Sequence, residues 1–194
     1  MPSISKLLLA TGQLSNSNTA SKRAADTAVL MIETTLNTRS SPRMFDSIAR
    51  INYLHGRYRR SGQISNDDML YTLSLFALEP SRWAANLDWR AFSEVELCAE
   101  GVLWKDIGEA MKIEFDVLEG DIKGKDGAAW LRALERWSLG YEEKASVPDE
   151  RNKKVAMGTL DILLINIPRV AKSFFTGVAT AVLDERTRTS MMYA

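Results

Sequence analysis

One histidine, His55, is the only imidazole in this chain, so it decides which imidazole chemistry the protein can perform. The chain also has a single cysteine, Cys98. A zinc site built from several His and Cys ligands is therefore excluded. A Ser-His-Asp triad or an imidazole-ligated haem would each require His55. The sequence predicts that any imidazole chemistry takes place at this position.

The segment around His55 has the apolar periodicity of an α-helix. A stripe with alternating spacings of four and three residues predicts an inward-facing surface that includes the histidine. A buried neutral histidine, hydrogen-bonded within the core, would satisfy this pattern. A metal-ligating histidine would satisfy it equally. The residues of this stripe are Met44, Ile48, Ile51, His55 and Tyr58.

Composition predicts a soluble globular protein. The chain has 194 residues, of which 45% are hydrophobic and 26% charged, and residues 1–194 are expected to form one domain. Lys+Arg and Asp+Glu are both 25, so charge gives no argument for a nucleic-acid partner. The lone cysteine fits a reducing compartment.

Charged residues interrupt the long apolar stretch from Leu160 to Leu183, so membrane association is expected to be peripheral at most. The apolar run at residues 7–10 is too short for a secretory signal, so the chain is not expected to be secreted.

Nearly every segment predicts helix, and no segment predicts a strand, so the expected fold class is an all-α, single-domain helical bundle. Helix-start signals include Ser41 with Pro42, and the pair Ser93 and Glu96 in a capping-box pattern. The three segments with the strongest apolar stripes are expected to pack around the His55 face; they are 41–61, 65–79 and 93–113. The remaining expected helices are 19–36, 80–89, 127–144, 150–166 and 168–190, with a polar loop at 119–127.

Six short motifs occur in the same order as in a known family of proteins. Through them, the chain resembles the fungal oxygenases of the MpaB type, which are related to the bacterial latex-clearing rubber oxygenases. The resemblance runs from about Lys6 to the C-terminus. The motifs are Lys22–Thr27, Arg50–His55, Asn66–Leu73, Leu78–Pro80, Asp88–Arg90 and Trp104–Met111.

The resemblance implies an oxidoreductase that holds haem b between helices, with His55 as the axial ligand of the iron. Dioxygen would be the co-substrate. The implied reaction is oxidative cleavage of a C=C bond in a prenyl or other secondary-metabolite intermediate, so the partner would be a hydrophobic small molecule. The implied location is the cytoplasm or the cytosolic face of the endoplasmic reticulum.

Rubber oxygenases also carry an Arg-x-x-Lys-Thr helix near the haem, and the resemblance matches it to Arg23, Asp26 and Thr27. Arg23 and Thr27 are therefore the expected catalytic residues, able to polarise bound oxygen or to hold a haem propionate. The family lysine is replaced by Asp26, which turns a cation near the oxygen into an anion. The alternative is a partly exposed helix face on which Lys22 and Asp26 form a surface ion pair.

The ends of the chain also depart from the family. Fungal relatives usually carry an N-terminal membrane-anchoring helix, and they continue past the region of Met191 to Tyr193. We therefore expect either a short or a truncated family member.

Two other functions remain open: a haem-free helical protein that binds a hydrophobic ligand or a partner, and a cofactor-independent tailoring enzyme using Arg23, Asp26 and His55 for acid–base chemistry.

Several other residues are interpreted as structural. Three tryptophans are expected in the core, although they could line a substrate channel. Three arginines could bind phosphate, but they are interpreted as cations that complement a helix C-terminus. The tryptophans are Trp83, Trp89 and Trp104, and the arginines are Arg57, Arg59 and Arg60. Cys98 is also expected to be structural. Asp67 and Asp68 are expected in the first turn of their helix.

Overall fold

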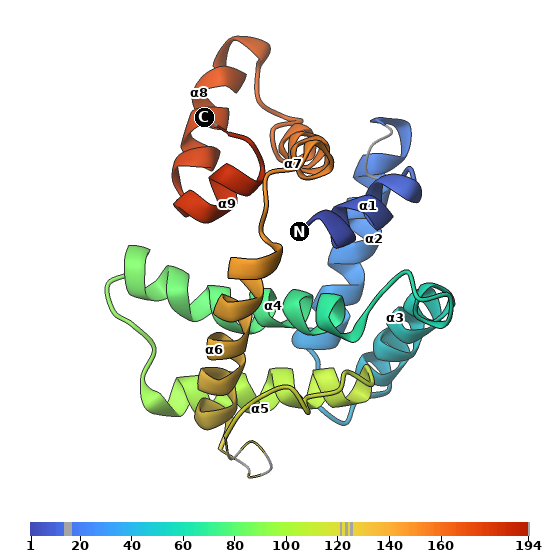
Figure 1. The fold of residues 1–194 in the computed structure, drawn as a ribbon, viewed down its shortest axis with the longest axis vertical. Coiled ribbons are helices and arrows are strands. Elements are labelled where there is room, and N and C mark those ends of the chain that lie inside the picture. The colour runs from blue at the N-terminus through green and yellow to red at the C-terminus, as the bar shows by residue number, and fades with distance from the viewer. Residues whose placement is uncertain (14–16, 121, 123, 125, 194) are drawn as a thin grey trace. The chain divides into compact units, whose positions relative to one another are not determined.

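The computed structural model describes residues 1–13, 17–120, 122, 124 and 126–193, and these residues form helices and connecting segments without any strand. The predicted all-α class is confirmed. Asp121, Lys123 and Lys125 of the predicted loop lie outside the described residues. The helices are α1 (Pro2–Ala10), α2 (Ser17–Thr35), α3 (Pro42–Arg60), α4 (Asn66–Leu87), α5 (Glu94–Ala110), α6 (Gly127–Ala145), α7 (Glu150–Leu163), α8 (Arg169–Ala181) and α9 (Glu185–Ser190) (Figure 1).

The chain divides into two compact units. One comprises Met1–Ile32 and Glu143–Ala194, and the other comprises Glu33–Glu142. We call them the terminal unit and the central unit. The expectation that residues 1–194 form one domain stays a prediction.

Helix starts follow the predicted capping chemistry. The Ser41 side chain accepts a hydrogen bond from the backbone N–H of Met44, and Pro42 occupies the first turn of α3. Ser93 and Glu96 form a reciprocal capping box at the start of α5, as predicted. A second box, made by Ser65 and Asp68, starts α4. These hydrogen bonds satisfy backbone N–H groups that a helix cannot satisfy itself.

Two predicted helix boundaries are wrong. The helix expected to end at Glu79 continues through Pro80, because α4 runs without a break to Leu87. Proline removes one backbone hydrogen bond, and α4 tolerates that loss at an exposed position. The segment expected as one helix over 168–190 forms α8 and α9. Asp184 accepts a hydrogen bond from the N–H of Thr187 and so begins a new helix.

The core of the central unit lies where α4, α5 and α6 meet. Leu70, Trp130 and Leu134 are inaccessible to solvent, and α4 packs against α5. Trp104 stacks on Phe76 with ring centroids 5.6 Å apart. Trp104 is thus a core residue as predicted. The same expectation is wrong for two others, because Trp83 is 47% and Trp89 85% exposed.

Helices α5 and α6 touch through two glycines. A Cβ atom at Gly101 would lie 2.0 Å from the carbonyl oxygen of Gly127, and one at Gly127 would lie 2.1 Å from the carbonyl oxygen of Cys98. Such distances are far inside van der Waals contact, and the opposing atoms belong to the backbone. Only glycine permits this approach, which lets the core side chains of both helices interlock.

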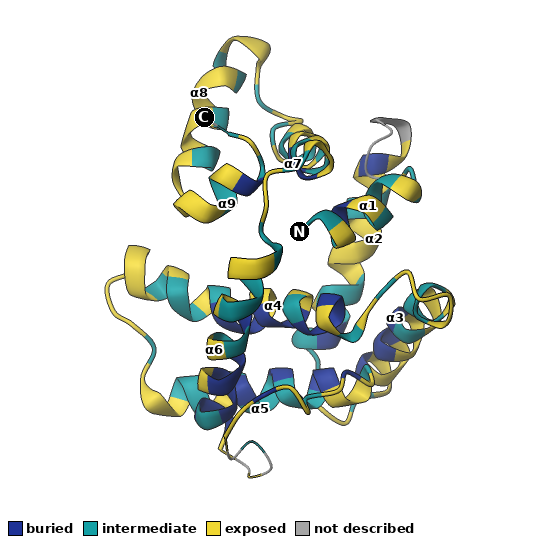
Figure 2. Cartoon of the chain, in the orientation of Figure 1, coloured by how far each residue is buried: buried dark blue, intermediate teal, exposed yellow. Residues whose placement is uncertain are grey.

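The terminal unit has few buried apolar side chains. Its α1 packs against α7, where the Ser5 hydroxyl donates to Asn152 Oδ1 at 2.7 Å. The Asn152 amide donates in turn to the carbonyls of Val147 and Ser190. No residue of α8 is buried, as the colours of Figure 2 also show. Among the described residues, no helix is both long and apolar enough to cross a bilayer.

Candidate functional site

Helix α3 places His55 on its inward face, as the apolar stripe predicts. Met44, Ile48 and Ile51 are buried. His55 and Tyr58, at the end of the stripe, are only half-buried. The Nδ1 atom of His55 is nevertheless shielded from solvent. The imidazole therefore has one protected nitrogen while part of its ring remains accessible.

Two side chains of α3 that flank His55 bind the carboxyl end of α5. The Asn52 amide donates to the carbonyl of Ala110 at 2.9 Å. The Arg59 guanidinium donates to the carbonyls of Met111 and Lys112, at 2.9 and 2.8 Å. The last carbonyls of a helix lack partners within that helix. Asn52 and Arg59 supply donors at this end, and the helical spacing places His55 between them.

Asn66, the first residue of α4, binds the chain just beyond the same helix end. Its amide donates to the carbonyl of Glu114 and its Oδ1 accepts from the N–H of Glu114, both at 2.9 Å. We call the set Asn52, Arg59 and Asn66, with residues 110–114, the α5 joint. Asn52 and Asn66 belong to two of the family motifs, so the α5 joint gives these motif residues a structural role.

The arginines at the end of α3 occupy its last turn, as predicted for cations that complement a helix C-terminus. The structure adds that Arg59 serves α5 through two hydrogen bonds, a role that the sequence pattern did not indicate. Asp67 and Asp68 lie in the first turn of α4 as expected. Asp68 Oδ1 also accepts a hydrogen bond from the Tyr141 hydroxyl at 3.3 Å, which links α4 to α6.

Arg23 and Thr27 contact each other on α2. The Arg23 guanidinium donates to the Thr27 hydroxyl oxygen, and that hydroxyl donates to the Arg23 carbonyl at 2.9 Å. Beside them, Lys22 and Asp26 form an exposed ion pair at 2.6 Å, as the structural alternative expects. The structure thus brings Arg23 and Thr27 together. They belong to the terminal unit and His55 belongs to the central unit.

The His55 imidazole, half-buried on the helix face that carries the buried Ile51, is a nitrogen donor of the kind that would hold a haem iron. The described residues place two hollows, of about 730 and 450 Å³, along α5. Neither hollow is lined by His55. The larger is mostly apolar and includes Val95, Cys98 and Val102. No group of three or more metal-ligating side chains occurs among the described residues.

Glu100 on α5 is a candidate that the sequence analysis missed. Its Oε2 atom is buried and has no hydrogen-bond partner among the described residues. Burial raises the pKa of its carboxyl to about 7. A group with such a pKa can exchange protons near neutral pH. The signal in the sequence was an acid on an apolar stripe, since Leu97, Glu100, Trp104 and Ile107 follow one another at spacings of three and four residues.

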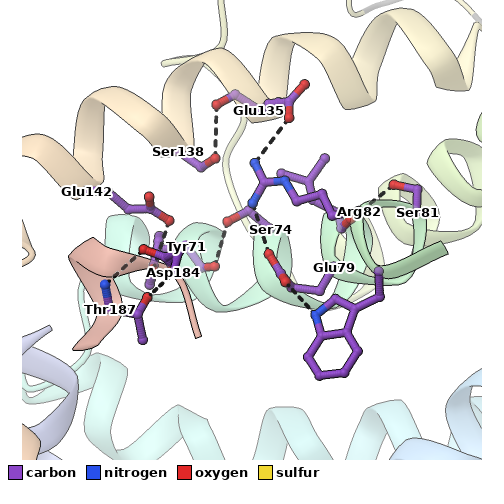
Figure 3. Close-up of polar contacts among 12 residues, drawn as sticks. Tyr71, Ser74, Glu79, Ser81, Arg82, Glu135, Ser138, Glu142, Asp184 and Thr187 are labelled. Carbon is purple, nitrogen blue, oxygen red and sulfur yellow. Dashed lines mark hydrogen bonds and ion pairs between the residues drawn. The ribbon is translucent and has the colours of Figure 1, made fainter. Parts of the chain in front are cut away.

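A second polar cluster joins α4 to α6 (Figure 3). Arg82 donates to Glu79 at 2.9 Å and to Glu135 at 3.1 Å. The indole N–H of Trp83 donates to the other oxygen of Glu79 at 3.1 Å. Glu79 belongs to the family motif Leu78–Pro80, and here it fixes two neighbouring side chains of its own helix. Through Arg82, this cluster holds α4 and α6 together.

Comparison with known proteins finds similar sequences in two fungi. The chain is 41% identical over 194 residues to the ER-bound oxygenase mpaB' of Penicillium brevicompactum, which covers all of this chain and 46% of the relative. It is 41% identical over 194 residues to the ER-bound oxygenase mpaB of Penicillium roqueforti (strain FM164), covering 65% of that protein. A further mpaB of Penicillium brevicompactum is 44% identical over 167 residues, which are 86% of this chain and 43% of the relative.

The chain therefore spans about half the length of the curated relatives it matches. No family model matches its sequence, and no solved structure matches it. The matched region contains His55, Arg23 and Glu100 alike, because the first two alignments cover the whole chain.

Proposed function

We infer that this chain, which belongs to the MpaB family of proteins, catalyses an oxygenase reaction with dioxygen as co-substrate. The observation that carries this proposal is 41% identity along all 194 residues to a protein named an ER-bound oxygenase. The chain matches only part of that relative's length, so the proposal concerns the reaction to which this region contributes. An oxidoreductase of this class acts on a small molecule and needs no nucleic-acid partner.

The finer proposal is a haem b oxygenase that cleaves a C=C bond in a prenyl or other secondary-metabolite intermediate. When bound, the haem supplies the redox chemistry that uses dioxygen. The imidazole of His55 would hold the haem iron. Ile51, buried one helical turn before His55 on the same face, would help to shield that donor from water. Arg23 and Thr27 are the proposed catalytic residues, with a guanidinium and a hydroxyl already in contact.

Replacing the donor tests the finer proposal. The protein is expressed with haem supplied in excess, and the Soret band and the iron content per folded protein are measured. The wild type is expected to bind haem, and His55→Ala is expected to lose it. Tyr53→Ala is the matched control, because Tyr53 lies on the same helix and is 75% exposed. A wild type without haem, or a His55→Ala variant with full occupancy, contradicts the proposal.

A second candidate function is supported by the hollows along α5. The larger one is mostly apolar and does not include His55. The alternative function is a haem-free protein that binds a hydrophobic ligand in this open hollow, at Val95, Cys98 and Val102. Two measurements separate the functions. A haem-free binder has no Soret band, and a prenyl compound added to it protects the Cys98 thiol from reaction with a maleimide.

The relatives are named ER-bound oxygenases, which supports association with the endoplasmic reticulum. We propose a peripheral association with the cytosolic face of that membrane. Alkaline carbonate treatment is expected to release the expressed chain from membranes without detergent. A chain that stays in the membrane pellet after carbonate contradicts this proposal.

A further inference from the structure

Helix α8 exposes an apolar stripe. Val170, Phe174, Val178 and Val182 follow one another at intervals of four residues, and such residues lie on one side of a helix. Val170 is 96% and Phe174 69% exposed. Val178 and Val182 are also exposed. This is a contiguous surface, which differs from the singly scattered apolar side chains that most protein surfaces carry.

The opposite side of α8 is the less apolar one, and it is the side that is partly covered. Thr176 and Thr180 are half-buried, and the Thr180 hydroxyl donates to the Thr176 carbonyl at 3.0 Å. A helix on the surface of a globular protein normally turns its apolar side inward. Helix α8 has the reverse orientation, so its apolar stripe is available to an outside apolar phase.

Charge identifies that phase. From Ile162 to Leu183 the chain contains no Asp or Glu, and its charged residues there are Arg169 and Lys172. Neither cation forms an ion pair with another described residue. An apolar stripe accompanied by unpaired cations suits a membrane surface that bears anionic lipids. With 13 residues, α8 is too short to span a bilayer but long enough to lie along its surface.

We propose that α8 is the membrane-docking surface of this protein, and that it lies in the interface of a bilayer containing anionic phospholipid. Val170, Phe174 and Val178 would enter the boundary between head groups and acyl chains. Arg169 and Lys172 lie on the side of the helix away from the stripe, Arg169 exposed and Lys172 half-buried, and would remain at head-group level. The proposal rests on the peripheral membrane association proposed above, and it names the surface responsible.

Vesicle co-sedimentation tests this surface. The purified chain is mixed with phosphatidylcholine vesicles, with or without about 30 mol% phosphatidylserine, an anionic lipid that gives the vesicles a negative surface potential. The wild type is expected to bind the anionic vesicles more tightly. Phe174→Asp is expected to lower the partition coefficient about tenfold or more. Arg169→Gln with Lys172→Gln is expected to lower it about fivefold per charge, only on anionic vesicles.

Matched variants separate docking from general effects. Phe45→Asp makes the same substitution on α3, where Phe45 is 58% exposed. Arg50→Gln with Arg57→Gln removes two cations from the same helix α3. Both controls are expected to bind vesicles as the wild type does. Far-UV circular dichroism and the unfolding midpoint confirm that each variant compared is folded.

The possible outcomes differ in what they overturn. Vesicle binding that survives Phe174→Asp, or that falls equally with Phe45→Asp, overturns the assignment to α8 and leaves membrane association standing. A wild type that binds no vesicles overturns both. If the wild type is a dimer in sedimentation velocity and Phe174→Asp is a monomer, the stripe joins two copies of the chain and the proposal fails. The Soret band of the wild type reports on the oxygenase proposal separately.

Discussion

The α5 joint and helix α8 use amphipathic helices in opposite ways. At the joint, the apolar stripe of α3 faces inward and its polar neighbours Asn52 and Arg59 hold the last carbonyls of α5. On α8, the apolar stripe faces outward and the threonines lie on the covered side. Both helices have clear apolar periodicity. Periodicity therefore identifies an amphipathic helix but does not decide which of its faces the fold covers.

The difference between the two regions lies in what surrounds each helix. Helix α3 meets backbone groups that need donors, and it supplies them through side chains on the flank of its apolar stripe. Helix α8 has no buried residue, so few contacts of its own unit depend on its side chains. We therefore expect substitutions near α5 to change the free energy of unfolding and substitutions on α8 to change binding.

The largest effect is expected from Gly101→Ala, in the core that supports the joint. The new Cβ would lie 2.0 Å from the carbonyl oxygen of Gly127, which is backbone and cannot rotate away. The free energy of unfolding should fall by about 3 kcal/mol or more. Urea denaturation followed by tryptophan fluorescence measures this.

Gly140→Ala is the matched control for Gly101→Ala. Gly140 also lies inside a helix, but nothing is within 4 Å of its Cβ position. This variant should be more stable by about 0.5–1 kcal/mol, because a helical glycine is entropically costly. Equal destabilisation by both substitutions would show that α5 and α6 do not meet through Gly101.

The next largest effect is expected at the joint itself. Arg59→Ala removes two hydrogen bonds to the carbonyls of Met111 and Lys112, and should cost about 1.5–3 kcal/mol. Arg57→Ala, at an exposed position in the same helix turn, should change stability by less than about 0.5 kcal/mol. Chemical denaturation of both variants compares them directly. If they unfold at the same urea concentration, Arg59 does not stabilise the end of α5.

A smaller effect, which depends on pH, is expected at Glu100. Its pKa of about 7 in the folded chain lies above the ordinary value of 4.5, so folding favours the protonated carboxyl. The contribution of this carboxyl to the free energy of unfolding is fully present below pH 4.5 and is lost as the pH rises through 7. Glu100→Gln should remove this loss and stabilise the chain at pH 8 by about 1–2 kcal/mol.

The measurement for Glu100 is the free energy of unfolding of wild type and variant at pH 5 and pH 8. The difference between them should grow with pH. Glu96→Gln is the control, because its pKa is lowered to about 2 by hydrogen bonds from Arg90 and Ser93, and this carboxyl is already ionised at both pH values. A Glu100→Gln effect that is the same at pH 5 and pH 8 would contradict a raised pKa.

Local signals predicted much of the fold. Ser41, Pro42 and the box of Ser93 with Glu96 mark helix starts through hydrogen bonds within one turn, so the sequence contains all that is needed. The end of α4 was mispredicted at Pro80, because local propensity misses what tertiary contacts can tolerate. The division of the chain into two units depends on contacts between distant segments, which no local pattern reports.

The sequence predicted which face of α3 is buried, but not the hydrogen-bond partners of the side chains beside that face. The stripe is buried at Met44 and Ile51 as predicted, and His55, one turn further along it, is half-buried. The partners of Asn52 and Arg59 could not be predicted, because their acceptors lie more than fifty residues away in the sequence. The acid on the stripe of α5, Glu100, could have been identified from spacing alone. Its raised pKa depends on burial, which spacing does not supply.

The smallest effect on stability is expected from Phe174→Ser on α8. Truncating a phenylalanine in a protein core usually lowers the free energy of unfolding by about 3–5 kcal/mol. Phe174 is 69% exposed and its aromatic neighbour is Phe175 on the same helix, with ring centroids 5.4 Å apart. Truncation should therefore change the free energy of unfolding by about 0.5 kcal/mol or less.

Phe115→Ala provides the contrast. The Phe115 ring meets the buried Trp130 ring edge-on, with ring centroids 5.4 Å apart, so this substitution should lower the free energy of unfolding by about 3 kcal/mol. Urea denaturation in the absence of lipid compares the two variants. A loss at Phe174 as large as that at Phe115 would show that the stripe of α8 is part of a core, and the contrast between the two regions would disappear.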